Sequence, residues 1–303
     1  SLTSITIPAS VTSLGYNAFV NCTSLATVTM EGATPPKLGS AMVFWNTGLN
    51  TILVPATALS AYQDACDKSE KGWKGEYKDK LAVGGYCGAS TNEGGVESVK
   101  WAFNPATGKL TISGTGAMKN FSSSAPWNNY RSQITSVVIE NGVTCIGRNA
   151  FFQCSSLKSI TIPSSVTSIN DNAFYNCTGL TSIEIPASVI EIRFTAFSTC
   201  SNLQTVTFAD GSQLKTIADG AFYNCGNLAT VVMKSVSPPA LYNDPFGAAA
   251  PNLQIFVPKG SLEEYKNDFW WSDYKDYLKE GPYGYCGAED NTGGVTSVAW
   301  NFD

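Results

Sequence analysis

The chain has 303 residues, of which 43% are hydrophobic and 14% charged, and its formal net charge at neutral pH is −5. That length is enough for one large or two ordinary domains with a sizeable core. The Lys and Arg residues form no cluster that would follow a phosphate backbone, so we expect no nucleic-acid partner. The chain has no histidine, which excludes a His-containing catalytic triad, an imidazole general base and every metal site that needs a His ligand. Its apolar runs are too short to span a bilayer.

In chain order, the predicted elements repeat one phrase, L-x-x-I-x-I-P-x-S-V-x-x-I-x-x-x-A-F-x-x-C. The first copy opens at Leu2, a partial copy covers 134–154, and the series continues at Leu157, Leu180, Leu203 and Leu228. The period is roughly 23 residues, which is typical of a solenoid repeat.

Each copy predicts two short strands and a turn. In the copy at 157–177, alternating residues predict a strand at 159–162, and Pro163 ends it. A second strand is predicted at 166–169, followed by a compact helical turn at 172–177. One such unit cannot bury its own apolar side, so we expect the units to stack.

A larger repeat encloses the small one, because "GYCGASTNEGGVESVKWAFN" at 85–104 returns as "GYCGAEDNTGGVTSVAWNFD" at 284–303. We therefore expect residues 1–84 to be the C-terminal part of a first module with its end cap, 85–283 a complete second module, and 284–303 the start of a further one. Within the second module we expect a β-rich leader at 85–135, repeats at 136–235 and an end cap at 236–283. The chain begins and ends inside patterned segments, so we expect it to be a piece of a longer tandem array.

The phrase "LKSITIPSSVTSINDNAFYNCTGL" resembles the repeat of the BspA-like leucine-rich repeat proteins. The stretch "GKLTISGTGAM…APW" is similar to the segment that leads into such arrays, and "IFVPKGSLEEYKNDFWWSDY" to the element that ends them. The resemblance implies a mainly β, right-handed leucine-rich-repeat solenoid with short helical turns, interrupted by a β-rich inter-array segment. It also implies a secreted or cell-surface protein of bacteria, linked to adhesion, and it brings no catalytic residue.

Cysteine occupies one repeat position, three residues after the Phe of each Ala-Phe pair: Cys22, Cys154, Cys177, Cys200 and Cys225. Stacked units would place these cysteines about 5 Å apart, so disulfides are conceivable. We favour free thiols that pack as small hydrophobes, because each thiol would have two identical neighbours and parallel side chains. Parallel columns offer no tetrahedral ligand set, so we expect no metal site.

One position varies while the frame around it is constant. Two residues after the last apolar residue of the second strand, the units carry Tyr16, Arg148, Asp171, Phe194 and Asp219. No single packing environment would accept all five, so we expect this column to face solvent, as a binding ridge or a neutral surface. On the first strand, Thr161, Glu184 and Thr207 are expected to line the outer face of the sheet, which suits hydrogen bonding to a partner but is also typical of any exposed strand.

Aromatic residues gather at the ends of the arrays, above all Trp270, Trp271 and Tyr274. They are candidates for stacking on sugar rings, or for a cap that seals the open apolar face of the last unit. Carboxylates such as Glu263 and Glu264 show no convergence, so we expect no enzyme, no cofactor and no catalytic residue. The sequence therefore favours non-catalytic adhesion to a host protein or matrix component, with a structural spacer as the alternative and a glycan-binding module as a third possibility.

Overall fold

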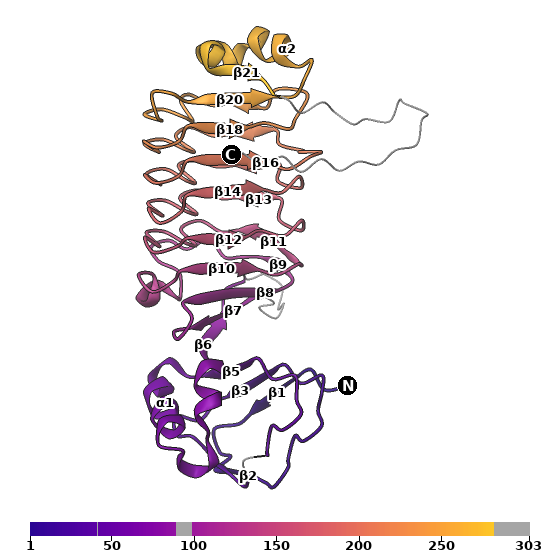
Figure 1. Cartoon of the computed structure of the whole chain (residues 1–303), viewed down its shortest axis with the longest axis vertical. Coiled ribbons are helices and arrows are strands. Elements are labelled where there is room, and N and C mark those ends of the chain that lie inside the picture. Colours follow the sequence, from indigo (N-terminus) through magenta and orange to yellow (C-terminus); the bar gives the residue numbers. More distant parts are fainter. Residues whose placement is uncertain (41, 89–98, 282–303) are drawn as a thin grey trace, which may run out of the picture.

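The computed structural model describes residues 1–40, 42–88 and 99–281. It shows two stacks of short strands, with the first stack at the N-terminal end and a taller second stack beyond it (Figure 1). The predicted start of a further module at 284–303, including Cys286, lies outside the described residues. Within the described ranges, no helix is long and apolar enough to cross a membrane.

Each repeat contributes one strand of three or four residues, and these strands pair in parallel with their equivalents in the next unit, except between β12 and β14, where one sheet ends and another begins. The backbone alternates outward polar and inward apolar residues, as a strand with one buried face requires. In the first stack these strands are β1 (Ser4–Ile7), β3 (Thr27–Met30) and β5 (Thr51–Val54). In the second stack they are β10 (Ser136–Ile139), β12 (Ser159–Thr161), β14 (Ser182–Ile185), β16 (Thr205–Phe208), β18 (Thr230–Val232) and β20 (Gln254–Val257).

On another side of the solenoid, shorter strands form a second parallel sheet in each stack. Most of these strands have two residues. The strand predicted at 166–169 is shorter than expected because the Val166 N–H closes a turn onto the Pro163 carbonyl and delays its start to Ser168. The strands are β2 (Ser13–Leu14) and β4 (Lys37–Leu38) in the first stack, and β9 (Gly116–Ala117), β11 (Val143–Ile146), β13 (Ser168–Ile169), β15 (Glu191–Ile192), β17 (Thr216–Ile217) and β19 (Ala240–Leu241) in the second.

The segment predicted as a helical turn is a pair of tight turns. Asn172 and Asn176 have φ of 53° and 57°, in the left-handed region, and their equivalents Asn17 and Asn21 have φ of 56° and 61°. A helix cannot continue through such residues. Asn tolerates this region better than most side chains, which explains why asparagine recurs at these turn positions.

The two stacks share one sheet. Three strands form the junction: β6 (Leu81–Tyr86), β7 (Val99–Asn104) and β8 (Lys109–Gly114). They pair with one another antiparallel, β6 with β7 and β7 with β8. At the two sides of this group, β6 pairs in parallel with β5 of the first stack, and β8 pairs in parallel with β10 of the second. A Cβ on Gly84 would lie 2.3 Å from the Trp101 carbonyl oxygen, so the close approach of β6 and β7 requires glycine there. The sheet is therefore continuous from the first stack into the second.

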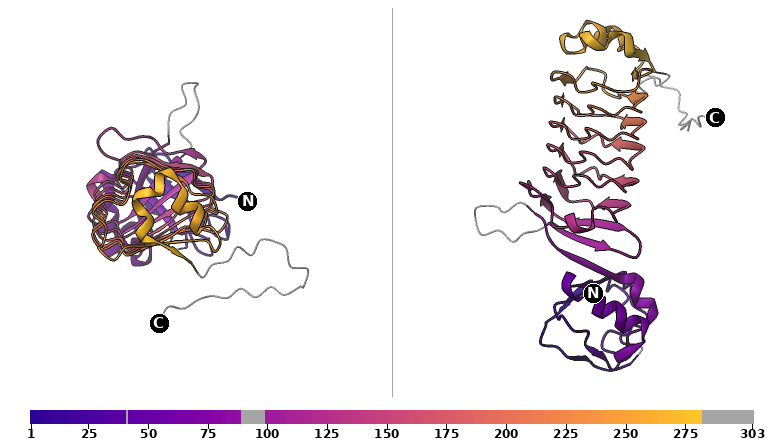
Figure 2. Two further views of the ribbon diagram at one scale, coloured as in Figure 1. Left: turned by 90° about the horizontal axis from the view of Figure 1, so that it is seen from above. Right: turned by 90° about the vertical axis from the view of Figure 1, so that its left-hand side faces the viewer.

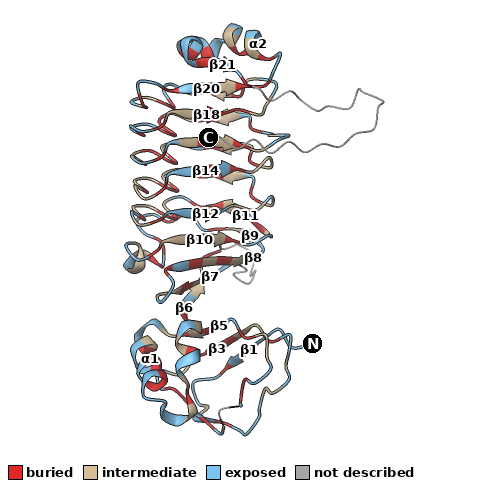
Figure 3. Cartoon of the chain, viewed as in Figure 1, coloured by how far each residue is buried: buried red, intermediate tan, exposed pale blue. Residues whose placement is uncertain are grey.

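Inside the second stack the Phe of each Ala-Phe pair forms a column of stacked rings. Phe174 lies 5.1 Å from Phe151 and 4.9 Å from Phe197, centroid to centroid, and all three are fully buried. The column starts at Trp127, beside η4 (Asn128–Tyr130), and continues through Phe222 and Phe246 to Tyr274. Burial is concentrated on the inner side of the coils, as Figure 3 shows.

The cysteines extend this core. Cys154, Cys177, Cys200 and Cys225 are free and buried, and Cys22 is free and half-buried. The Sγ–H of Cys200 donates to the Phe174 carbonyl of the preceding unit at 3.1 Å, and Cys177 and Cys225 do the same in their units. The thiols of Cys177, Cys200 and Cys225 thus fill space and also join two units with a weak hydrogen bond.

Candidate functional site

The variable ridge, defined as Tyr16, Arg148, Asp171, Phe194 and Asp219, lies in the turn that follows each second strand. Backbone hydrogen bonds connect the ridge from one unit to the next. The residue directly after each ridge position donates its N–H to the carbonyl of the ridge residue one unit later: Asn149 donates to Asp171, and Asn172 donates to Phe194. These hydrogen bonds are independent of side-chain identity. Residues of different chemistry can therefore occupy the ridge without changing its geometry.

The side chains of the ridge are exposed or half-buried, as predicted. Phe194 is 50% exposed although its neighbours along the ridge are aspartates, so a large apolar ring lies in solvent at a position where the frame accepts a charge. Tyr16 is 75% exposed, but it belongs to the first unit, which has only one neighbour within the chain. Asp219 is half-buried.

Arg148 and Asp171 form an ion pair along the ridge, with 2.5 Å between Nη2 and Oδ2. The Arg148 guanidinium makes a second contact through Nε at 3.2 Å. The Arg148 side chain is 53% exposed, so solvent screens the pair and its contribution to stability is small, about 1 kcal/mol or less. Both groups remain at the surface for a partner to contact.

The first-strand residues lie on a different sheet from the ridge. Thr161 and Glu184 are exposed and Thr207 is half-buried, on β12, β14 and β16. The ridge follows the short second strands, which pair in sheets separate from those of β12, β14 and β16. Around Thr161 the first-strand face carries small polar residues such as Ser159 and Ser182.

The last unit of the second stack is sealed by α2 (Leu262–Asn267) and η5 (Phe269–Tyr277), which lie across its end before β21 (Leu278–Glu280) joins the sheet (Figure 2). The indole Nε1 of Trp271 donates to the Pro239 carbonyl at 2.8 Å, and the Tyr265 hydroxyl donates to the Ser235 carbonyl at 2.8 Å. The Tyr274 ring meets the end of the phenylalanine column edge-on, 5.5 Å from Phe246.

For Trp270, Trp271 and Tyr274 the sequence left two interpretations open, sugar stacking or a cap, and for two of the three the structure supports the cap and contradicts an exposed patch. Trp271 is fully buried and Tyr274 is 7% exposed, while Trp270 is 44% exposed. The reason is the period of the helix: residues three apart in a 3₁₀ helix share a face, so Trp271 and Tyr274 both face the array. These two rings are parts of the cap and cannot stack on a ligand.

Trp270 instead belongs to a group of exposed rings that the sequence did not indicate. Its ring lies 5.6 Å from that of Tyr242, in the turn after β19, and 5.2 Å from that of Phe269. Tyr242 is 48% exposed and Phe269 is 79% exposed. We call Tyr242, Phe269 and Trp270 the three-ring surface. The only sequence signal for it was the Phe-Trp-Trp run, because Tyr242 is distant in sequence.

The first stack ends in a cap of the same design: α1 (Leu59–Asp67), preceded by η1 (Ala56–Ala58) and followed by η2 (Glu70–Gly72) and η3 (Gly75–Lys80). Trp73 donates from Nε1 to the Pro36 carbonyl at 2.9 Å, and Tyr77 meets the end of its phenylalanine column edge-on. The two caps differ in their exposed rings. Gly39, directly after β4, corresponds to Tyr242, directly after β19. Gly72, directly before the buried Trp73, corresponds to Trp270, directly before the buried Trp271. Capping therefore does not require the exposed rings.

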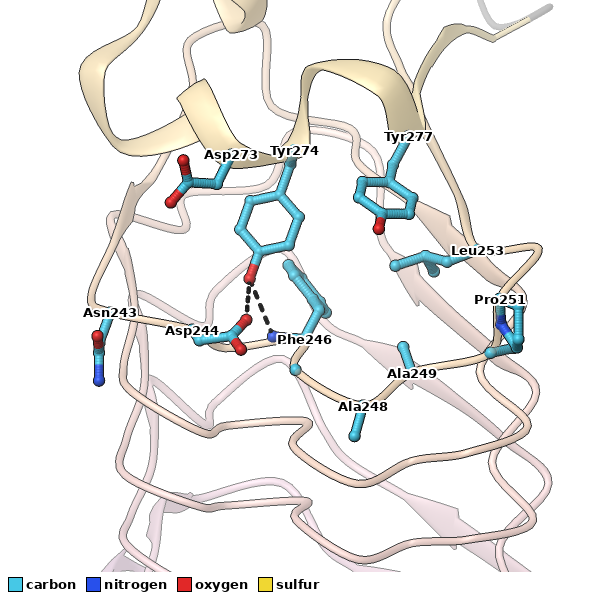
Figure 4. A pocket seen from close by; sticks show the side chains of 12 residues that line it. Asn243, Asp244, Phe246, Ala248, Ala249, Pro251, Leu253, Asp273, Tyr274 and Tyr277 are labelled. Carbon is cyan, nitrogen blue, oxygen red and sulfur yellow. Dashed lines mark hydrogen bonds between the residues drawn. The ribbon is translucent and has the colours of Figure 1, made fainter.

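A hollow of about 440 Å³ lies under the C-terminal end of η5. Exposure increases along the inner face of η5: Trp271 is 0%, Tyr274 7% and Tyr277 38% exposed. Figure 4 shows Tyr274 and Tyr277 descending from η5 toward a loop that carries Asp244, Phe246 and Leu253. The Tyr274 hydroxyl donates to Asp244 Oδ1 at 2.6 Å and accepts from the Phe246 N–H at 3.4 Å.

Burial raises the pKa of the Tyr274 hydroxyl, with a further contribution from its bond to the Asp244 carboxylate. The tyrosine therefore keeps its proton and donates a hydrogen bond to the Asp244 carboxylate. In the described part of the chain, no group of three or more Asp, Glu, Cys or His residues is arranged to hold a metal ion. The hollow offers hydrogen-bond acceptors and ring faces rather than a nucleophile activated by a neighbouring base.

The sequence profile described as "BspA type Leucine rich repeat region" matches six copies, over residues 1–71 and 128–244, which is more than half of the chain. The chain belongs to the BspA-type leucine-rich repeat family. The parallel strands, buried Leu and Ile columns and few short helices of the structure are those of a mainly β leucine-rich repeat fold, as predicted. A comparison with curated proteins gives no match.

Several solved structures resemble this BspA-type chain. A leucine-rich repeat protein from Eubacterium ventriosum is 21% identical with a TM-score of 0.39, covering 55% of this chain and 61% of its own. The T. pallidum leucine-rich repeat protein is 21% identical with a TM-score of 0.36, covering 64% of this chain and 99% of its own. The pneumococcal vaccine antigen PcpA is 16% identical with a TM-score of 0.37, covering 92% of this chain and 66% of its own. The chain thus spans less than two thirds of the length of the first of these.

Proposed function

We propose that this chain is a non-catalytic repeat protein, secreted or displayed on a bacterial cell surface, which binds host proteins or matrix components through the variable ridge. The membership in the BspA-type family supports a repeat scaffold that presents a surface. The modular organisation predicted above, with a complete module at 85–283 between parts of two others, is part of this proposal. Repetition of the module would let several weak contacts act together.

The observation that carries the proposal is the exposure of Phe194. An apolar ring that is 50% exposed, at a position where adjacent units have Asp171 and Asp219, contributes nothing that the frame needs. Exposed aromatic and arginine side chains are the residues that most often dominate binding energy at protein interfaces. Arg193 precedes Phe194 in the chain, and its side chain is also 50% exposed. The centre of the ridge therefore presents an aromatic and an arginine side chain together.

The alternative is a spacer that holds another domain away from the cell. A spacer needs a continuous stiff scaffold and a surface of small polar residues. The first-strand face around Thr161 has that character, but the ridge does not. We therefore place binding on the ridge and assign the first-strand face a weaker role.

The experiment compares substitutions that the frame already accepts. Phe194→Asp copies the residue of the neighbouring units, and the double variant Thr161→Glu, Thr207→Glu copies Glu184 on the other sheet. Binding of the full chain and both variants to immobilised matrix proteins is measured by surface plasmon resonance. We expect Phe194→Asp to weaken binding at least tenfold and the double variant to leave it unchanged. Loss only in the double variant would move the site to the first-strand face, and equal binding by all three proteins would reject both surfaces.

A further inference from the structure

We propose that the hollow at the end of the second stack, together with the three-ring surface, binds neutral carbohydrate. This site is separate from the variable ridge, and the proposal does not depend on protein binding there. It rests on a difference between the two caps, on the chemistry of the lining, and on the alignment of the hollow with the exposed rings.

The first cap serves as an internal control. Asn21 and Asn224 occupy equivalent positions and donate their N–H groups to Trp45 and Gly247 respectively, so Gly247 lines the hollow where the first cap has an indole. The strand after each cap begins with a leucine, and the residue before it is Lys80 in the first cap and Tyr277 in the second. Lys80 donates from Nζ to the Leu49 carbonyl at 2.8 Å. At Gly247 and Tyr277 the second cap thus differs from the first, although both caps seal a stack in the same way. Capping alone does not explain these two residues.

The lining of the hollow suits a ligand with many hydroxyl groups. The accessible lining is mainly polar, and its residues include Asp244, Asp273, Asn243 and Tyr277. Carboxylate and amide oxygens accept hydrogen bonds from sugar hydroxyls, while a tyrosine ring packs against the apolar C–H face of a sugar. The volume of about 440 Å³ is in the range of small-molecule sites.

The charge of the lining excludes acidic ligands. The described residues around the hollow include two aspartates and no lysine or arginine, so sulfated, sialylated and phosphorylated groups would be repelled. One oxygen of Asp244 already accepts a hydrogen bond from the Tyr274 hydroxyl, which leaves the other oxygen to accept from a hydroxyl of the ligand. A protonated amine would also satisfy the aspartates and contact the rings, so the test below includes a polyamine as a competitor.

The three-ring surface extends the site along η5. Tyr242 is adjacent in the chain to Asn243, and Trp270 is three residues before Asp273, which places Trp270 and Asp273 on the same side of the 3₁₀ helix. A sugar residue in the hollow can thus be followed by further residues against Trp270 and Tyr242. The arrangement fits an oligosaccharide better than a single hexose.

The test is binding of the labelled full chain to a printed array of neutral and anionic oligosaccharides, followed by titration of the strongest glycan. Trp270→Ala removes a ring that the first cap lacks, and Tyr277→Lys introduces the residue of the first cap. The matched control is Trp45→Ala, which removes an indole of similar exposure from the first stack. Thermal unfolding of each variant verifies that it is folded.

We expect binding to neutral glycans that weakens at least tenfold in Trp270→Ala and in Tyr277→Lys but is unchanged in Trp45→Ala. Absence of binding to neutral glycans, or preference for heparin, would overturn the proposal. Equal binding by folded Trp270→Ala and wild-type protein would also overturn it. Displacement of a bound glycan by millimolar spermidine would instead identify the hollow as a cation site. Phe194→Asp should leave glycan binding intact, which distinguishes this site from the ridge.

Discussion

Trp270 and Trp271 are adjacent in sequence but should differ strongly in what they contribute to stability. Trp271→Ala removes a fully buried ring, which typically costs about 3–5 kcal/mol, and it leaves the Pro239 carbonyl without its indole donor, which adds about 1–3 kcal/mol. We therefore expect a loss of about 5 kcal/mol. Trp270→Ala removes an exposed ring whose contacts are Tyr242 and Phe269, and it should cost about 1 kcal/mol or less.

The assay is urea unfolding combined with hydrogen exchange. In a repeat protein each unit contacts only its neighbours, so loss of the cap should first release the last units. We expect Trp271→Ala to increase exchange in β18 and β20 while β10 stays protected, and Trp270→Ala to leave both unchanged. If Trp270→Ala destabilises the chain as much as Trp271→Ala, the exposed rings are part of the cap, and the argument that they serve binding fails.

Three further predictions concern the frame. Phe197→Ala should lower the free energy of unfolding in urea by about 3–5 kcal/mol, because the ring is fully buried between Phe174 and Phe222. Phe194→Ala removes a half-exposed ring and should lower it by less than about 1 kcal/mol. Similar losses in the two variants would contradict the assigned burial. Asn172→Ala should cost about 1–2 kcal/mol since φ is 53°, whereas Asn172→Gly should be tolerated, and thermal unfolding of both checks this difference. Burial raises the pKa of the Cys154 thiol from 9.0 to about 12, so the unfolded chain loses this proton at a lower pH than the folded chain. The free energy of unfolding should therefore fall as pH rises from about 9 to 12. A urea unfolding midpoint that is constant over that interval would refute the assignment.

The repeat frame could be predicted from sequence because each frame position is set by contacts between identical units. The Phe and Cys positions recur, and so do their environments: Phe174 packs on Phe151 and Phe197, and Cys200 donates to Phe174. The solvent exposure of the ridge followed from the same logic, since Arg148 and Phe194 cannot share a packing site. The left-handed backbone of the turn asparagines was not predicted, and the prediction of a helical turn was wrong for that reason.

The array ends were less predictable because no repetition defines them. Adjacent tryptophans with opposite burial are resolved only by the orientation of η5 on the array. Tyr242 joins Trp270 across a long sequence separation, which no local pattern indicates. The hollow depends on Gly247 and Tyr277, single changes that become visible once the two caps are compared residue by residue.

The central claim is that the chain binds a partner rather than serving as a spacer. The most direct measurement is binding of the chain to immobilised host-matrix proteins, beside a protein that carries the 85–283 module in two tandem copies. The account predicts saturable binding that is about 100-fold tighter or more for the tandem protein, because the second contact becomes intramolecular. Absence of saturable binding by folded samples of both proteins would contradict it and would favour the spacer.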